Sequence, residues 1–130
     1  MVLGPDQESE QWVKVVANEL GLDYSVASKI RRGDRDVTVC VDNMINFDGR
    51  HILIVDDIIS SGMTVLKAAQ AAQERGARSI HAAVTHALFT WETEAMLKHM
   101  GIRQIISCDG VPHSTNKIPL APIIAKALAS

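Results

Sequence analysis

Short apolar runs and amphipathic stretches alternate along the whole chain. The short runs are either rich in β-branched residues or alternate apolar and polar residues, and both patterns predict β-strands. The predicted strands are residues 1–4, 23–28, 36–41, 51–57, 79–86 and 103–107. The run "HILIVDD" at 51–57 is continuous, which is typical of a parallel strand that is covered on both faces.

The stretches between the strands carry apolar residues at helical spacing. In the first stretch, the residues on one helical face are Trp12, Val13, Val16, Ala17 and Leu20. Gly21 ends this helix, and further helices are predicted at 64–76, 91–101 and 120–130. The charged segment "KIRRGDR" at 29–35 predicts a loop. The alternation predicts one α/β domain over residues 1–130, a three-layer sandwich with a mainly parallel central sheet.

Composition narrows the class of protein. Of the 130 residues, 47% are apolar and 22% are charged, which is typical of a globular domain. The net charge of −2 and the 4% of aromatic residues argue against a nucleic-acid surface, and the apolar runs are too short for a membrane helix. No secretory signal is visible, so we expect a cytoplasmic protein in which Cys40 and Cys108 are buried, reduced thiols.

Polar residues follow three of the predicted strands. In open α/β sheets, ligands bind in the crevice outside the carboxyl ends of the strands. The predicted ends carry Asp6, the turn from Asp56 to Thr64, and His86. We therefore expect a ligand site where these three segments meet.

The turn "DDIISSGMT" at 56–64 combines two acids with a small, hydroxyl-rich loop. The backbone N–H groups that begin the next helix lack partners and lie at the positive end of its dipole, so they favour an anion such as phosphate. A serine N-cap followed by a glycine kink is the structural alternative. Asp56 and Asp57 close the strand, where they can accept hydrogen bonds from sugar hydroxyls or hold Mg²⁺ through water. Together these features predict a ribose 5-phosphate site.

The same turn, "VDDIISSGMT", resembles the phosphoribosyl-diphosphate signature of type I phosphoribosyltransferases, with Met63 at a position that varies among them. Three segments are similar to the C-terminal domain of ribose-phosphate pyrophosphokinases. They are "VLGPDQESEQWVKVVANELGLDYSVASKIRRGDRDV", "ERGARSIHAAVTHALFT" and "CDGVP". This resemblance covers nearly the whole chain. It implies a type I phosphoribosyltransferase-like fold. It also implies the conversion of ATP and ribose 5-phosphate to AMP and 5-phosphoribosyl 1-diphosphate, with Mg²⁺ as cofactor.

The resemblance also implies roles for individual residues. The residues that would hold the 5-phosphate are Ser60, Ser61, Gly62, Met63 and Thr64. Asp56 and Asp57 would hold the ribose hydroxyls, and Asp6 would bind Mg²⁺ near the diphosphate. Lys29 and Arg31, on a mobile loop, would close over the substrates and neutralise the transferred diphosphoryl group, and Arg31 would also contact ribose 5-phosphate.

The histidines do not show metal-ligand spacing. His86 is expected to cap its strand, the alternative being a place near the ribose, and a structural or surface role is expected for His51, His81, His99 and His113.

The family that the chain resembles has two related domains, and the chain matches the second. The first supplies much of the ATP site, and neither a GxxxxGK[ST] nor a GxGxxG motif replaces it here, so we expect the chain to be inactive alone. A first strand that starts at Met1 predicts that the chain was cut or begins inside an older gene. We also expect a homo-oligomer. Two alternatives remain: a stand-alone phosphoribosyltransferase that acts on a base, and a non-catalytic relative that binds ribose phosphates.

Overall fold

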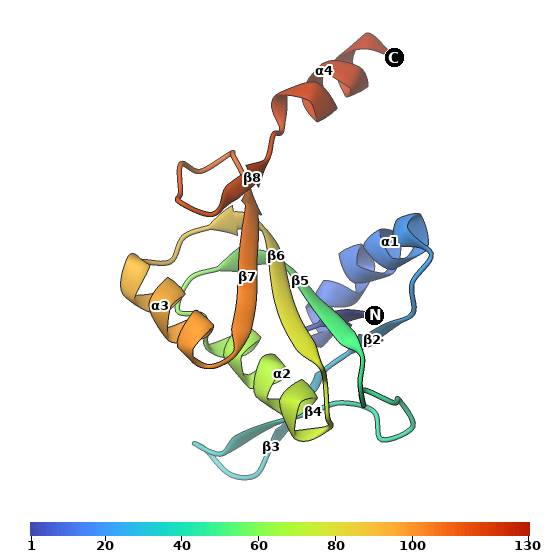
Figure 1. The fold of residues 1–130 in the computed structure, drawn as a ribbon, viewed down its shortest axis with the longest axis vertical. Coiled ribbons are helices and arrows are strands. Elements are labelled where there is room, and N and C mark those ends of the chain that lie inside the picture. The colour runs from blue at the N-terminus through green and yellow to red at the C-terminus, as the bar shows by residue number, and fades with distance from the viewer.

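A six-stranded parallel sheet forms the centre of the computed structural model, which describes residues 1–130 (Figure 1). Its strands are β1 (Val2–Gly4), β2 (Tyr24–Val26), β5 (His51–Ile59), β6 (Ser79–Ala87), β7 (Ile102–Cys108) and β8 (Asn116–Ile118). They lie in the order β2-β1-β5-β6-β7-β8, and every neighbouring pair is parallel. The mainly parallel sheet that the sequence predicts is confirmed.

Helices cover both faces of the sheet. The short 3-10 helix η1 (Gln7–Ser9) leads into α1 (Glu10–Leu20) on one face, whereas α2 (Met63–Glu74) and α3 (Trp91–His99) lie on the other (Figure 1). Gly21, left-handed at φ 63°, ends α1, and Thr90 caps α3 by accepting a hydrogen bond from the N–H of Thr93. The predicted three-layer arrangement is therefore confirmed.

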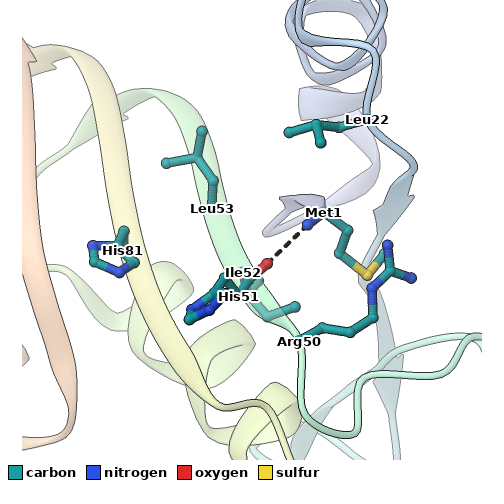
Figure 2. Close-up of a pocket in the computed structure, with 7 residues that line it drawn as sticks. All are labelled: Met1, Leu22, Arg50, His51, Ile52, Leu53 and His81. Carbon is teal, nitrogen blue, oxygen red and sulfur yellow. Dashed lines mark hydrogen bonds between the residues drawn. The ribbon is translucent and has the colours of Figure 1, made fainter.

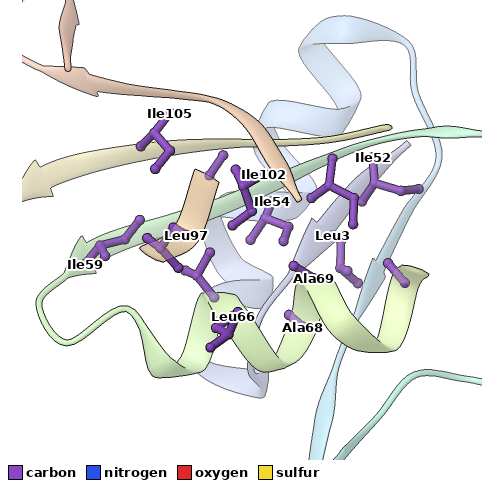
Figure 3. Close-up of a cluster of buried hydrophobic side chains, with 14 of the residues drawn as sticks. Leu3, Ile52, Ile54, Ile59, Leu66, Ala68, Ala69, Leu97, Ile102 and Ile105 are labelled. Atoms are coloured by element: carbon purple, nitrogen blue, oxygen red, sulfur yellow. The ribbon is translucent and has the colours of Figure 1, made fainter. Parts of the chain in front are cut away.

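The main hydrophobic core lies between the sheet and the pair of helices α2 and α3 (Figure 3). Ile52 and Ile54 of β5 and Leu97 of α3 are almost completely buried there. The side chains of Ala68 and Ala69 are small, which lets α2 approach the strands closely. Burial of each large aliphatic side chain contributes roughly 1.5–3 kcal/mol. A smaller apolar cluster fixes α1 on the opposite face.

The segment predicted as a loop at 29–35 is partly a strand. β3 (Ser28–Arg31) pairs antiparallel with β4 (Val37–Cys40) in a hairpin that is separate from the main sheet and packs along α2. The loop prediction was wrong for 29–31 because the exposed charged residues Lys29 and Arg31 hid the alternation of a strand. A connection remains at 32–36.

Two features at the carboxyl edge of the sheet also differ from the prediction. β5 continues past Asp57 because Ile59 is buried in the core, at 2% exposure, and pairs with Ala87 of β6. Asp56 and Asp57 therefore lie within the strand and not at its end. β8, at 116–118, was not predicted because so short a segment carries no periodic signal.

The last helix, α4 (Ala121–Ala129), confirms the predicted helix at 120–130 but projects from the body of the molecule (Figure 1). None of its residues is buried, and Ile123, Ile124 and Leu128 are exposed. None of the helices of the structure has the length and apolar character needed to cross a bilayer.

Candidate functional site

The predicted site segments meet beside the carboxyl ends of β1 and β5. Asp6 follows β1, and the turn at 60–62 follows β5. The β3–β4 hairpin brings Lys29 and Arg31 to the same region. Lys29 lines one groove of about 260 Å³ with Asp6, and another of about 220 Å³ with Thr64. Lys29 therefore stands between the loop after β1 and the start of α2.

Gly62 sets the geometry of the turn between β5 and α2. Its φ of +79° is a left-handed conformation that residues with a side chain rarely adopt. A Cβ at this position would lie 3.0 Å from Cγ2 of Thr93 and 3.3 Å from Leu97 on α3. Glycine thus permits both the turn and the close approach of α3. The sequence correctly places Gly62 at the start of the helix, whereas the alternative of a serine N-cap is wrong.

The first turn of α2 presents backbone donors without helical partners. The first intrahelical hydrogen bond runs from the N–H of Leu66 to the carbonyl of Gly62 at 2.9 Å, and no side chain caps the helix. The N–H of Met63 makes one long contact, 3.4 Å, to Oγ of Ser61. Ser60 and Ser61 are exposed and Thr64 is half-buried. Amide and hydroxyl donors therefore gather at the positive end of a helix, an arrangement that favours an anion.

The two acids of β5 have different environments. Asp56 is buried, at 9% exposure, and its Oδ1 accepts a hydrogen bond from the N–H of Asp57 at 3.0 Å. Asp57 is exposed, and its own Oδ1 accepts from the N–H of Ile58 at 2.8 Å. Burial raises the pKa of Asp56 to about 7; the hydrogen bond from Asp57 opposes the rise, and the nearby charges of Asp6 and Asp57 add to it. The pKa of Asp56 thus lies near neutral pH, whereas the neighbouring Asp57 faces solvent.

One oxygen of the Asp6 carboxylate caps η1, and the other is free to bind a ligand. Its Oδ1 accepts a hydrogen bond from the N–H of Ser9 at 3.1 Å, and Oδ2 makes no hydrogen bond. The structure contains no group of three or more His, Cys, Asp or Glu side chains that could hold a metal ion alone. Mg²⁺ usually takes one or two protein carboxylates and completes its shell with water and substrate phosphates. Asp6 therefore fits Mg²⁺ that arrives with a phosphorylated ligand.

Lys67 lines the groove of Lys29 and Arg31, and sequence reasoning missed it. It lies on α2 three residues after Thr64, so both side chains are on one face of the helix. That spacing was the available signal. The spacing indicates a shared groove only because the hairpin packs against the same face of α2, and the sequence does not show that packing.

The histidines and cysteines lie outside these grooves. His113 has a structural role, as expected: its Nε2 lies 2.8 Å from the carbonyl oxygen of Phe89 and its Nδ1 2.8 Å from Oγ1 of Thr115. His86 lies within β6, one residue before its end, and pairs with Ile58 of β5, so it does not cap the strand. Both cysteines are free thiols, as expected, but they are half-buried and not buried.

A further cavity, of about 450 Å³, lies at the opposite end of the strands (Figure 2). His51, Leu53 and His81 line it, and the N-terminal amine of Met1 donates a hydrogen bond to the carbonyl of His51 at 2.8 Å. None of the residues predicted to bind ligand lies in this cavity. The candidate site is therefore at the carboxyl edge.

Comparison with known proteins identifies the family. Residues 1–113 match the phosphoribosyl transferase domain. The chain belongs to this family. It is 34% identical over 128 residues to a ribose-phosphate pyrophosphokinase of Methanopyrus kandleri, and 35% identical over 127 residues to one of Sulfolobus acidocaldarius. These alignments cover 98% and 94% of this chain but 44% and 42% of the relatives, so the chain spans less than half of their length.

Solved structures share the fold of this phosphoribosyl transferase domain. Phosphoribosylpyrophosphate synthetase from Mycobacterium smegmatis has a TM-score of 0.75 at 22% identity, over 98% of this chain and 43% of that one. Orotate phosphoribosyltransferase from Aeropyrum pernix has a TM-score of 0.66 at 18% identity, over 99% of this chain and 65% of that one. The phosphoribosyltransferase-like fold and the resemblance to ribose-phosphate pyrophosphokinases are both confirmed.

Proposed function

We propose that this phosphoribosyl transferase domain binds ribose 5-phosphate and supplies half of a ribose-phosphate diphosphokinase site. In that reaction ATP and ribose 5-phosphate give AMP and 5-phosphoribosyl 1-diphosphate. The observation that carries the proposal is the combination of an uncapped start of α2 with Asp56 and Asp57 on the strand that leads into it. Similarity to proteins named ribose-phosphate pyrophosphokinase favours this reaction over transfer of ribose to a base.

The ribose 5-phosphate would lie across the turn between β5 and α2. Its phosphate would accept hydrogen bonds from the free amides of the first turn and from the hydroxyls of Ser60, Ser61 and Thr64, with Gly62 and Met63 contributing backbone. Asp57, which is exposed, would accept hydrogen bonds from the ribose hydroxyls. Asp56 is buried, and its carboxyl oxygen accepts the hydrogen bond from the N–H of Asp57, which ties the two acids together.

The diphosphoryl group would lie between the loop after β1 and the hairpin. Lys29 lines the groove with Asp6, and Arg31 lines the neighbouring groove with Thr64. Transfer of such a group depends mainly on positioning and on charge stabilisation, which these cations would provide. Mg²⁺, when bound, would neutralise phosphate oxygens, and Asp6 is the residue suited to hold it.

The remaining half of the site would come from another domain. The chain spans 44% of the length of the M. kandleri relative. This supports the proposal that residues 1–130 form a single domain, the second of two related domains in such an enzyme. The adenine of ATP would be bound by that other domain, so the isolated chain would be inactive in synthesis. Partners would be ribose 5-phosphate, ATP, 5-phosphoribosyl 1-diphosphate and further copies in a cytoplasmic homo-oligomer.

Phosphorus NMR of the purified chain with Mg²⁺, ATP and ribose 5-phosphate tests the proposal. We expect a saturable shift of the ribose 5-phosphate resonance without formation of AMP. Appearance of AMP and 5-phosphoribosyl 1-diphosphate would show that the chain carries a complete site. Absence of any shift at millimolar sugar phosphate would contradict the proposed binding.

A matched pair of variants locates the sugar. Asp57→Asn removes an exposed carboxylate from the proposed ribose contact, whereas Asp48→Asn makes the same change in an exposed turn elsewhere. Loss of the charged hydrogen bonds should weaken ribose 5-phosphate binding about tenfold in Asp57→Asn and leave it unchanged in Asp48→Asn. Equal affinities in both variants would rule out the assigned ribose contact.

A further inference from the structure

One face of the central sheet is only half covered. On the face that meets α2 and α3, residues of β6 and β7 such as Ile80 and Ile105 are buried. On the opposite face of the same strands, Ala83 and Ile106 are only half-buried, whereas α1 packs over β1, β2 and β5. Parallel sheets of α/β proteins are normally covered on both faces. The part of this face formed by β6, β7 and β8 therefore lacks a covering element.

An apolar groove of about 310 Å³ lies on this half-covered face, and we call it the β6–β8 groove. Its lining is apolar except for Asp56 and Thr85. Six of the apolar lining residues are Val16, Val55, Ala83, Ile106, Cys108 and Ile118. Apart from Asp56, the groove shares no residue with the candidate ribose phosphate site. Exposed apolar surface of this kind marks a site of interaction.

Helix α4 carries an apolar face that its own chain leaves uncovered. Ile124 and Leu128 are four residues apart and lie on one side of the helix, with exposed fractions of 54% and 81%. Ala121 and Ala125 lie close to the same face, and Lys126, the one charged residue of α4, lies on the opposite side. The alanines allow close approach to a sheet, as those of α2 do on the other face.

The connection before α4 directs the helix away from the groove of its own chain. Only Pro119 and Leu120 separate Ile118, which lines the groove, from the first residue of α4. The N–H of Leu120 donates to Oδ1 of Asp109 at 2.9 Å, and the N–H of Asp109 donates to the carbonyl of Ile118 at 3.1 Å. These bonds hold the start of the helix that projects from the body (Figure 1). Docking of α4 in its own groove would break them.

We propose that two copies of this chain form a dimer in which α4 of each copy docks, through Ile124 and Leu128, in the β6–β8 groove of the other. Because α4 begins beside the groove, at Ile118, a twofold axis near β8 places each helix over the groove of the other copy. Charge favours this occupant, since the docking face of α4 is uncharged and the one charged residue of the groove is the acid Asp56. This contact gives the proposed homo-oligomer a defined interface.

The dimer is expected to be weak. Two nine-residue helices form a small interface beside the roughly 1,200–2,000 Å² of stable complexes, so we expect a dissociation constant on the order of 10–100 μM. At protein concentrations near this constant, mass action adds little to the stability of each chain. Removal of α4 therefore abolishes the dimer and leaves the domain folded.

Sedimentation equilibrium without ligand tests the dimer separately from ribose 5-phosphate binding. Between about 1 and 300 μM, the average mass of the full chain should rise from one chain toward two. Deletion of 121–130 and Ile124→Asp should each keep the chain monomeric. Val15→Asp is the matched control, because Val15 is exposed to 59% on α1, and it should leave association unchanged. A full chain that stays monomeric, or a dimer that survives the deletion, would overturn the proposal.

Cysteine cross-linking tests whether the β6–β8 groove is where α4 docks. One chain carries Cys40→Ser and keeps Cys108 in the groove as its single cysteine. The other carries Cys40→Ser and Cys108→Ser, with a new cysteine at Ile124, Leu128 or Lys126. Mild oxidation of the mixed chains should link the two through Ile124→Cys or Leu128→Cys, and not through Lys126→Cys on the far side of the helix. Equal yields at all three positions, or no link at any, would refute docking in this groove.

Other occupants of the groove predict different results. If α4 docks in the groove of its own chain, a chain with both Cys108 and Ile124→Cys forms an internal disulfide and sediments as a monomer. If a different protein fills the groove, a maleimide modifies Cys108 equally fast in the full and truncated chains. Either result would overturn the exchange. In the proposed dimer, modification of Cys108 slows as the concentration of the full chain rises and stays fast after deletion of 121–130. Near-native circular dichroism checks that each variant folds.

Discussion

The backbone N–H of Asp57 donates a 3.0 Å hydrogen bond to Oδ1 of Asp56, so neighbouring acids on one strand are tied to each other through the main chain. Asp56 is buried, and Asp57 is exposed. Two carboxyl groups of the same type thereby acquire different properties. Asp56 is held as a group that titrates near neutral pH, and Asp57 is free to meet a ligand.

The elevated pKa of Asp56 should make stability depend on pH. Its pKa is raised from 3.8 to about 7, mainly by burial, so between these values the folded state binds a proton that the unfolded state releases. The free energy of unfolding should therefore fall as pH rises from about 4 to about 7, by at most about 4 kcal/mol from this group. Asp56→Asn stays neutral and lacks this loss.

The measurement is urea denaturation of the parent chain and Asp56→Asn at a series of pH values. Other groups contribute to both proteins and cancel in the difference. We expect the Asn variant to gain relative stability steadily up to about pH 7 and then to level off. Parallel profiles across the whole range would contradict the raised pKa.

Gly62 should tolerate substitution poorly. In Gly62→Ala, the left-handed backbone and the 3.0 Å approach to Cγ2 of Thr93 should together cost about 2–3 kcal/mol. Gly33→Ala is the matched control, because Gly33 also has positive φ but its added Cβ meets no atom within 4 Å. Chemical denaturation should show a cost of about 1 kcal/mol for the control. Equal costs would mean that contact with α3 is unimportant.

Arg75 should stabilise the segment that follows the hairpin. Its guanidinium donates to the carbonyls of Val41, Asp42, Asn43 and Ile45, at 2.6 to 3.3 Å, and lies 5.1 Å from the ring centroid of Phe47. A lysine ammonium cannot reproduce this fork, so Arg75→Lys should cost about 2 kcal/mol. Arg78→Lys, at an exposed site without side-chain hydrogen bonds, should stay within about 0.5 kcal/mol. A similar thermal shift in both variants would refute the role of the fork.

Removal of α4 should leave the domain folded. No residue of Ala121–Ala129 is buried, so deletion of 121–130 should change the free energy of unfolding by less than about 1 kcal/mol. Differential scanning calorimetry of the truncated and full chains at one concentration measures this. A large fall in the thermal midpoint would show that α4 makes stabilising contacts in solution, within one chain or between copies. Repeating the scan at tenfold dilution separates these two cases.

The main strands and the principal helices followed from the sequence because each has its own local signal. The continuous apolar run at 51–57 marks a doubly covered strand, and Gly21 and Gly62 mark helix boundaries through their left-handed backbone. The candidate phosphate site was equally local, since a strand, two acids, a small-residue turn and a helix start are contiguous in the chain. For such features, neighbouring residues contain the physical cause.

Tertiary structure decided the features that depend on contacts between residues far apart in the chain. Ile59 extends β5 past the acids because the core buries it, and within that strand Asp56 is buried whereas Asp57 is exposed. Lys29 and Arg31 lie on a strand because Val37–Cys40 pairs with it, and the packing of this hairpin on α2 brings Lys67 to them. Sequence fixes the charges and local propensities of these residues. Their burial and their neighbours arise only when segments far apart in the chain pack together.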